Sequence, residues 1–335
     1  MLIFLVLILL FFIFILVTSA SHAFVFKFNK YKDSLWYFIW NNDIPEEFHG
    51  SNCIRVGTLG PQQEDTQKIR IVFIRHGQSV WNSVYNEKNR DLPFNIVRTL
   101  LLEIRYFFTQ PLASGLIDSP LSAEGIQQSK ELANFMQGAE GRISFDTSTS
   151  VILCSNLRRT MQTALIGLDP RLKLSGEKIV VNSALQEGSR FIDTHSFSSE
   201  SGKMAPMTFP GFEDPAKVLN MFDARLNKGN KSIETDLNGR SDIFLSHTFG
   251  GTIVPAISGE NGAKNLNEII VVGHSIFFRN FFKRFLPRNS SHIAKKYKME
   301  NCAVVAFDLI RNVSTGEVVI DENSIKPLYK GFIKT

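Results

Sequence analysis

Cysteine is scarce in this chain and forms no metal or disulfide pattern. The 335 residues include three cysteines, Cys53, Cys154 and Cys302, which lie far apart and form no C-x-x-C pair. Structural zinc sites use closely spaced Cys and His residues, and disulfide-built scaffolds need a dense, paired set of cysteines. The sequence therefore predicts neither a structural metal site nor a disulfide framework.

Dense blocks of positive charge are also missing. The net charge is +5, from 37 Lys and Arg against 32 Asp and Glu. Proteins that bind nucleic acids usually concentrate Lys and Arg in a cluster or stripe. We therefore expect no nucleic-acid partner, while a mildly basic balance suits a small anionic substrate. With 44% hydrophobic and 21% charged residues, the composition is that of a globular protein.

The N-terminus lacks charge altogether: no Lys, Arg, Asp or Glu occurs before Lys27. Residues 2–17 are almost wholly Leu, Ile, Phe and Val, and about 20 apolar residues suffice to span a bilayer. Small residues at 18–23 offer cleavage sites for a signal peptide, but no positive region precedes the run. Two interpretations stay open: a single-pass membrane anchor, or a cleaved signal that directs the chain to the secretory pathway.

Strand-like and helix-like segments alternate from Lys68 onward. Strands are expected at 69–74, 151–154, 179–181, 268–272 and 302–309, and helices at 122–136, 158–168, 216–226 and 276–285. The alternation predicts an α/β fold, a three-layer α/β/α sandwich with a mostly parallel central sheet. We divide the chain into a hydrophobic segment at 1–24, a stem at 25–67 and one domain at 68–335.

Two stretches of this domain look inserted. Residues 92–116 carry an amphipathic, strongly apolar helix that packs on the surface, lines the site or touches a membrane. Residues 196–262 are rich in Gly, Ser, Asn and Pro, and we expect them to form a cap or irregular excursion.

Polar residues follow several of the expected strands. They include Arg75, His76, Ser79 and Asn82 after the first strand, Arg158 and Arg159 after the second, Glu187 after the third and His274 after the fourth. The carboxyl ends of parallel strands meet at one edge of a sheet, where ligands bind. An imidazole beside guanidinium groups makes a plausible pocket for an oxyanion, with a nucleophile inside it.

These residues lie in ordered blocks with a specific likeness. The blocks are 75–82 (RHGQSVWN), 118–125 (DSPLSAEG), 155–164 (SNLRRTMQTA), 185–187 (LQE), 273–275 (GHS) and 301–303 (NCA). In them the chain resembles the histidine phosphatase superfamily, in its phosphoglycerate-mutase-like branch, over roughly 68–310. One RHG tripeptide is weak evidence, whereas several blocks in the right order and strand–helix context are specific.

The resemblance implies catalysis through a phosphohistidine. His76 would be the nucleophile, Arg75, Arg159 and His274 would hold the phosphoryl oxygens, and Glu187 would serve as general acid and then base. Phosphoryl transfer depends mainly on positioning and electrostatics, so the resemblance implies no metal and no other cofactor. Arg158, next to Arg159, is expected to face solvent.

Other residues receive lesser expectations. Gly77, Ser79 and Asn82 are candidate phosphate or substrate contacts, and Gly77 and Gly273 are expected to let the backbone approach the ligand closely. Arg190 and Asp193 either touch substrate or form a structural ion pair. His195, His247 and His292 lie outside every motif and are expected at the surface or in loops.

The superfamily includes mutases and phosphatases. Glu187 is followed by Gly-Ser-Arg-Phe-Ile-Asp-Thr-His, without the Tyr-Gly block to be expected of a dedicated phosphoglycerate mutase. Hydrolysis of a phosphomonoester is therefore the expected reaction. A phosphoglycerate mutase-type phosphotransferase and a non-catalytic, membrane-tethered phosphate-binding scaffold remain alternatives. The expected partners are a phosphorylated substrate and a membrane, contacted through the N-terminal segment, and the sequence gives no indication of oligomeric state.

Overall fold

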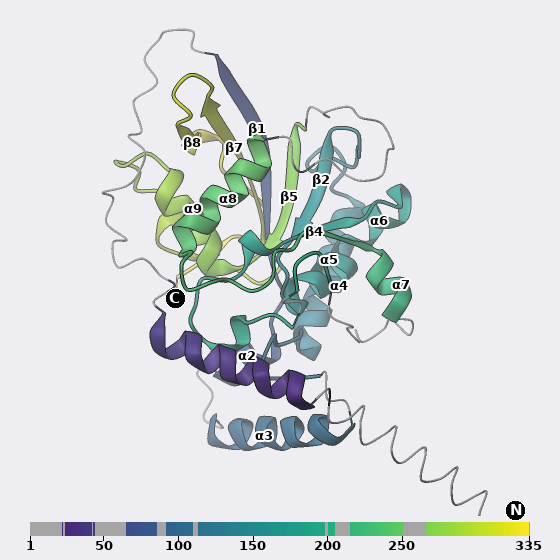
Figure 1. Ribbon diagram of the computed structural model, residues 1–335. Helices are drawn as coiled ribbons and strands as arrows, with labels where there is room; N and C mark the ends of the chain where they lie inside the picture. The colour runs from purple at the N-terminus through teal and green to yellow at the C-terminus, as the bar shows by residue number, and fades with distance from the viewer. Residues whose placement is uncertain are drawn as a thin grey trace, which may run out of the picture.

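A central sheet of eight strands organises the described part of the chain (Figure 1). The computed structural model describes residues 22, 24–41, 43, 65–85, 92–109, 113–197, 200–204, 215–250, 253 and 266–334. The strands of the sheet are β1 (Thr66–Arg75), β2 (Ser150–Cys154), β3 (Ile179–Asn182), β4 (Phe222–Leu226), β5 (Glu268–Gly273), β7 (Val304–Asn312), β8 (Val318–Ile320) and β9 (Lys326–Tyr329). A separate small sheet pairs β6 (Lys298–Met299) with β10 (Phe332–Ile333).

The sheet is mostly parallel, as the sequence predicts. Its order is β4-β3-β2-β5-β1-β7-β8, with β9 also pairing with β7. The strands from β4 to β1 are parallel to their neighbours, whereas β7 is antiparallel to β1 and both β8 and β9 are antiparallel to β7. The parallel strands therefore end at one common edge.

Helices cover both faces of the sheet. The labelled helices of the described part are α2 (Val80–Tyr85), α3 (Leu92–Thr109), α4 (Ala123–Gln137), α5 (Arg158–Gly167), α6 (Asp169–Ser175), α7 (Pro215–Asn220), α8 (Leu237–Phe249) and α9 (Ser275–Phe285), of which α2 and α3 lie at the base of the molecule (Figure 1). Along β1 the side chains alternate: Ile71 and Phe73 pack in one core with α8 and α9, and Val72 and Ile74 pack in another with α4, α5 and α6. This is the predicted three-layer α/β/α sandwich.

Local signals placed helix α4 correctly. Its N-cap is Ser122, whose Oγ accepts a hydrogen bond from the backbone N–H of Gly125 at 3.0 Å. A hydroxyl that satisfies an unpaired N–H of the first turn is a strong helix-start signal, and it is encoded within four residues.

The helix predicted over 216–226 is wrong in its second half. Helix α7 ends at Asn220, and β4 follows as the edge strand next to β3. Phe222 and Leu226 are buried there, because the open edge of β3 offers hydrogen bonds that a local helix signal does not reveal. The stretch 196–262, expected to form a cap or irregular excursion, supplies both this sheet strand and helix α8, which the sequence does not predict and which buries Phe244 completely.

Part of the N-terminal stretch packs on this domain. Residues 24–40 are helical (the N-terminal helix, purple in Figure 1) and lie beside α3 at the base of the molecule. Lys27 Nζ lies 2.6 Å from Glu103 Oε1 and donates to the Ala113 carbonyl oxygen at 2.8 Å. Among the described residues, no helix is long and apolar enough to cross a membrane. Residues 1–21, on which the prediction of an anchor or signal depends, lie outside the described part.

Candidate active site

His76 and His274 meet where two central strands end. His76 follows β1 and His274 follows β5, and the His76 backbone N–H donates to the Gly273 carbonyl oxygen at 3.0 Å. The two ring centroids are 5.1 Å apart, and the residues are 2% and 0% exposed. Parallel pairing of adjacent strands therefore brings the two histidines together although 198 positions separate them.

The hydrogen bond of the His76 ring selects its tautomer. Nδ1 lies 2.6 Å from the Gly77 carbonyl oxygen. A carbonyl oxygen only accepts hydrogen bonds, so Nδ1 carries the proton. In the neutral ring Nε2 then holds the lone pair, which is the state that a nucleophilic nitrogen needs.

Burial keeps that ring neutral. Removal from water, reinforced by the positive charges of Arg159 and Arg75, holds the pKa of His76 well below its ordinary value of 6.5. The hydrogen bond to Gly77 acts in the opposite direction but does not prevail. At neutral pH the imidazole is therefore unprotonated at Nε2.

His274 is buried without hydrogen bonds to either ring nitrogen. It is the N-cap residue of α9, and Nδ1 and Nε2 have no partner among the described residues. Burial, together with Arg159, also holds the pKa of His274 well below 6.5. A buried polar ring with no partner costs free energy, so this arrangement indicates a group that is satisfied by a ligand.

Two guanidinium groups lie near the histidines. Arg75 Nη1 donates to the Met299 carbonyl oxygen at 2.6 Å, and Arg159 Nη1 donates to the Asp193 carbonyl oxygen at 2.8 Å. In each side chain Nε is buried and lacks a partner in the described part of the chain. Desolvation lowers the pKa of Arg75 to about 10, so its charge persists at neutral pH.

Glu187 completes the cluster from the third strand. It follows β3 and the short 3₁₀ helix Ser183–Leu185, and its residue is 6% exposed. Oε1 accepts hydrogen bonds from the backbone N–H groups of Gly188 at 3.0 Å and Phe277 at 3.2 Å. Phe277 lies in the first turn of α9, and these two bonds fix the orientation of the Glu187 carboxyl group.

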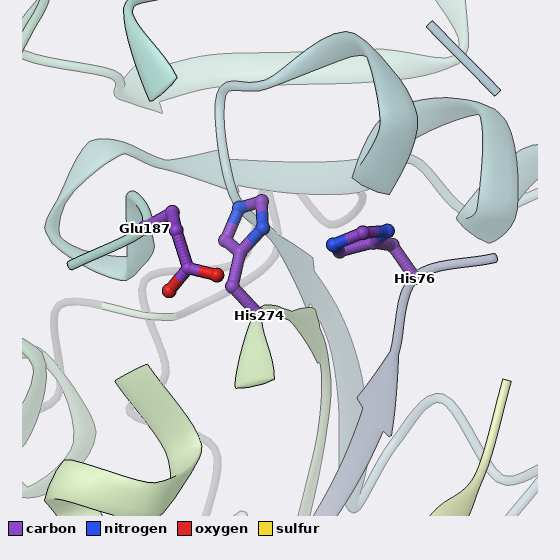
Figure 2. A group of neighbouring side chains, drawn as sticks. All are labelled: His76, Glu187 and His274. Atoms are coloured by element: carbon purple, nitrogen blue, oxygen red, sulfur yellow. The ribbon is translucent and has the colours of Figure 1, made fainter. Parts of the chain in front are cut away.

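The three side chains converge on one point (Figure 2). His76, Glu187 and His274 each offer one ligand atom, and these atoms lie within 4.8 Å of one another. Two imidazole nitrogens and a carboxylate oxygen are ligands that a divalent transition metal accepts. The same geometry therefore suits a phosphoryl group or a metal ion.

The glycines of the two histidine motifs serve internal packing. A Cβ on Gly77 would lie 2.6 Å from the Gly125 carbonyl oxygen, and one on Gly273 would lie 2.8 Å from the Phe278 ring. The expected close approach is thus to other parts of the protein. Ser79 is fully buried, and its Oγ accepts from the Asn82 N–H at 3.1 Å, which caps the start of α2.

Arg158 does not face solvent, so that prediction is wrong. It is 5% exposed, and its guanidinium donates to the carbonyl oxygens of Ser114, Ile117 and Asp118. The Asp118 carboxylate in turn accepts from the Arg158 N–H at 2.7 Å. Arg158 and Asp118 therefore hold the 114–118 turn against the start of α5, next to Arg159.

His195 lies in the loop after the 3₁₀ helix Ile192–Thr194, as expected, but it is buried at 4% exposure and so is not at the surface. Its ring makes an edge contact with Tyr37, with centroids 4.7 Å apart. His247 and His292 are half-buried. Asp193 pairs with Arg159, with Oδ2 3.5 Å from Nη1, and the Arg190 guanidinium lies 5.0 Å from the centroid of the Phe38 ring.

A buried charge cluster beside the site escaped the sequence analysis. Asp43 Oδ2 lies 2.8 Å from Lys231 Nζ, and Asp43 Oδ1 lies 2.6 Å from Arg240 Nη1. Lys231 also donates to the backbone oxygens of Glu187 and Ser189. No motif marks these residues, because 188 positions separate Asp43 from Lys231.

Comparison with known proteins finds one matching family model. The family model described as "Histidine phosphatase superfamily (branch 1)" matches residues 107–189, less than half of the chain. The resemblance to that superfamily is confirmed. The matched region includes Arg159 and Glu187, begins after His76 and ends before His274. It supports phosphatase or phosphotransferase activity in general terms. Among curated proteins, no match to the chain is found.

Several solved structures are similar at low identity. A mycobacterial glucosyl-3-phosphoglycerate phosphatase complexed with VO3 is 15% identical, with a TM-score of 0.37, covering 76% of this chain and 97% of its own. A phosphoserine phosphatase mutant from Entamoeba histolytica, with phosphoserine, is 17% identical, with a TM-score of 0.34 and coverages of 76% and 95%. An ecdysone phosphate phosphatase from Bombix mori, with tungstate, is 17% identical, with a TM-score of 0.41 and coverages of 80% and 95%.

Proposed function

We propose that this chain is a phosphomonoester hydrolase that works through a phosphohistidine on His76. The observation that carries the proposal is the His76 ring, which is buried, neutral and protonated at Nδ1 by its bond to Gly77. The lone pair of Nε2 is then available for attack on phosphorus. The family match over 107–189 supports the same class of chemistry.

The first step transfers the phosphoryl group to the protein. His76 Nε2 forms a bond to phosphorus while the bond from phosphorus to the ester oxygen breaks. Glu187, protonated at this stage, gives its proton to the leaving oxygen, so the alcohol departs neutral. General acid catalysis of this kind contributes typically about 10²–10⁴-fold.

The second step returns the protein to its starting state. Water attacks phosphorus as Glu187, now a carboxylate, takes one of its protons. The bond from phosphorus to Nε2 breaks, inorganic phosphate leaves, and His76 is again neutral. The two steps together consume the phosphomonoester and one water, release the alcohol and inorganic phosphate, and leave Glu187 protonated again.

The surrounding cations stabilise the transferring group in both steps. Arg75 and Arg159 have buried Nε groups without partners in the described part of the chain. Charge-assisted hydrogen bonds from guanidinium groups match the oxygens of a phosphoryl group. His274 is neutral, so it would donate one N–H to these oxygens and so satisfy its orphaned ring.

The central test is hydrolysis of an aryl phosphate by the purified full chain in mild detergent. We expect turnover in the presence of EDTA, and we expect His76→Ala to abolish it while the exposed His22→Ala leaves it unchanged. Rapid quenching into alkali should trap one phosphate on the peptide that contains His76, because phosphohistidine resists base. Unaltered turnover in His76→Ala would rule out the nucleophile.

Two further measurements separate the alternatives. Glu187→Gln should slow an alkyl phosphate far more than an aryl phosphate, because only the poor leaving group depends on a proton. Activity that EDTA removes and Zn²⁺ restores would instead indicate a metal on His76, Glu187 and His274. Interconversion of the two monophosphoglycerates, dependent on a bisphosphate primer, would indicate a mutase.

A further inference from the structure

The N-terminal helix exposes large apolar side chains along one face. Their residues are between 53% and 64% exposed, and they are Val25, Phe28, Leu35, Trp36, Ile39 and Trp40. The opposite face is the one that packs on the protein: Lys27, Ser34 and Tyr37 are buried. The helix is therefore amphipathic with its apolar stripe turned outward, the reverse of an ordinary surface helix.

Helix α3 shows the same reversal. Its large apolar residues with 49% to 69% exposure are Phe94, Val97, Leu100, Leu101 and Ile104. Four of them recur at the spacing of one helical face. The residue on the inner side, Thr99, is 5% exposed.

Polar contacts join the two helices, so the helices lie next to each other. Glu103 of α3 lies 2.6 Å from Lys27 Nζ and accepts from the Tyr31 hydroxyl at 2.8 Å. Figure 1 shows both helices together at the base of the molecule, outside the sandwich. We call the eleven exposed residues named above the apolar two-helix surface. Contiguous apolar patches of this kind are rare on soluble monomers and mark contact sites.

We propose that the apolar two-helix surface lies on a lipid bilayer, with both helices in the plane of the interface. The first argument is continuity along the chain. The apolar run 2–17 ends only eight positions before Val25, the first residue of the apolar two-helix surface, and no charged residue lies between them. A bilayer that receives the run therefore meets this helix next.

The second argument is the chemistry of the surface. Trp36 and Trp40 are aromatic residues of the type that prefers the headgroup region of membranes. The exposed charges of α3, Arg98 and Arg105, are both positive, and the N-terminal helix exposes Lys32 beside Asp33. Apolar side chains fringed by Lys and Arg are typical of helices that bind anionic bilayers in their interface.

The tryptophans provide a direct test. The chain has three, and Trp81 lies in α2, packed on Tyr85 with ring centroids 4.2 Å apart. The full chain would be reconstituted in phosphatidylcholine–phosphatidylserine vesicles with or without brominated acyl chains. In Trp81→Phe, which keeps Trp36 and Trp40, we expect strong quenching by the brominated lipid. In Trp36→Phe/Trp40→Phe, which keeps Trp81, we expect little quenching by the brominated lipid.

Substitutions on α3 test the surface as a unit, independently of the run at 2–17. In the Trp81→Phe background, Phe94→Asp/Leu101→Asp/Ile104→Asp should reduce the quenching of Trp36 and Trp40 at least about twofold, because charge at the interface costs free energy. Leu174→Asp, at an 80% exposed position of α6, is the matched control and should leave it unchanged. Circular dichroism and the urea unfolding midpoint check that each variant folds.

Two results would overturn the proposal. One is quenching of Trp36 and Trp40 no greater than that of Trp81. The other concerns hydrogen exchange of the α3 backbone amides. If their protection rises with protein concentration in detergent but does not change when vesicles are added, a second copy of the chain covers this surface. Both measurements are independent of phosphatase activity, so they stand even if the proposed function fails.

Discussion

At the scale of single residues, burial sets the chemistry of the histidines. His76, His195 and His274 are all at most 4% exposed, and desolvation lowers the pKa of each. The motifs identified His76 and His274, whereas nothing in the sequence around His195 indicates that Tyr37 covers it. Local sequence determines which residue is present, and packing determines whether it stays neutral.

His195 should make the protein less stable in acid. Burial lowers its pKa to about 3, so between the unfolded pKa of about 6.5 and that value only the unfolded state binds the proton. As pH falls through this window, the free energy of unfolding should decrease by about 1.4 kcal/mol per pH unit relative to a variant without the ionisable ring. Urea titrations of wild type and His195→Gln between pH 7 and pH 4 measure the difference.

The pH slope of that difference is the diagnostic quantity. Loss of the Tyr37 contact in His195→Gln adds a constant offset, which does not vary with pH. The exposed His22→Gln is the control and should give a flat difference. A flat line for His195→Gln as well would mean that His195 is protonated in the folded protein.

At the scale of elements, the loop after β1 and the start of α4 touch backbone to backbone. A Cβ on Gly125 would lie 2.0 Å from the Gln78 carbonyl oxygen, and one on Gly77 would lie 2.6 Å from the Gly125 carbonyl oxygen. The N-cap bond of Ser122 fixes where α4 begins. These contacts place the loop that follows His76 against a helix, and they explain why the block at 118–125 accompanies the RHG block.

Gly125→Ala should therefore damage both stability and activity. Backbone atoms cannot move aside as a flexible side chain does, so we expect a loss of about 3 kcal/mol or more in the free energy of unfolding. Turnover should fall as well, because the displaced loop carries His76. Gly138→Ala is the matched control in the same helix region, since its Cβ would meet one atom at 4.0 Å. Equal stability of the two variants in urea would contradict this account.

At the scale of the whole molecule, a buried ion cluster connects the N-terminal stretch to the loop of Glu187. Asp43 pairs with Lys231 and Arg240 and accepts the Ser189 N–H at 3.0 Å. The two cations lower the pKa of Asp43 against the effect of its burial, so the carboxylate stays ionised. Lys231 then holds the backbone of Glu187 itself.

Asp43→Asn should destabilise the protein and slow its turnover of an aryl phosphate. Removal of one member of a buried ion cluster leaves uncompensated charge and costs about 3–5 kcal/mol. The double variant Asp43→Asn/Arg240→Gln should lose less than the sum of the two single variants, as urea denaturation would show. The exposed Asp33→Asn is the control. Strict additivity of the two single changes would mean that Asp43 and Arg240 do not interact.

The features of the fold that the sequence predicts correctly depend on residues that lie close together in the chain. The strand at 69–74, the cap at Ser122 and the helix after His274 depend on neighbouring residues, and the structure has all three. The strand at 222–226 was missed because its partner β3 lies about 40 positions earlier in the chain. The prediction that Arg158 faces solvent is wrong because its acceptors, carbonyl oxygens at 114–118, lie about 40 positions before it in the chain.

The sequence by itself determined the α/β/α class, and it predicted the candidate set of His76, Arg75, Arg159, Glu187 and His274. Periodicity, capping and motif order are local properties, and a parallel sheet brings its strand ends together in any such fold. The tertiary structure decided the tautomer of His76, the burial of His195, the Asp43 cluster and the outward apolar face of two adjoining helices. Each of these depends on contacts between distant residues, which set desolvation and pairing, and no short window of sequence contains them.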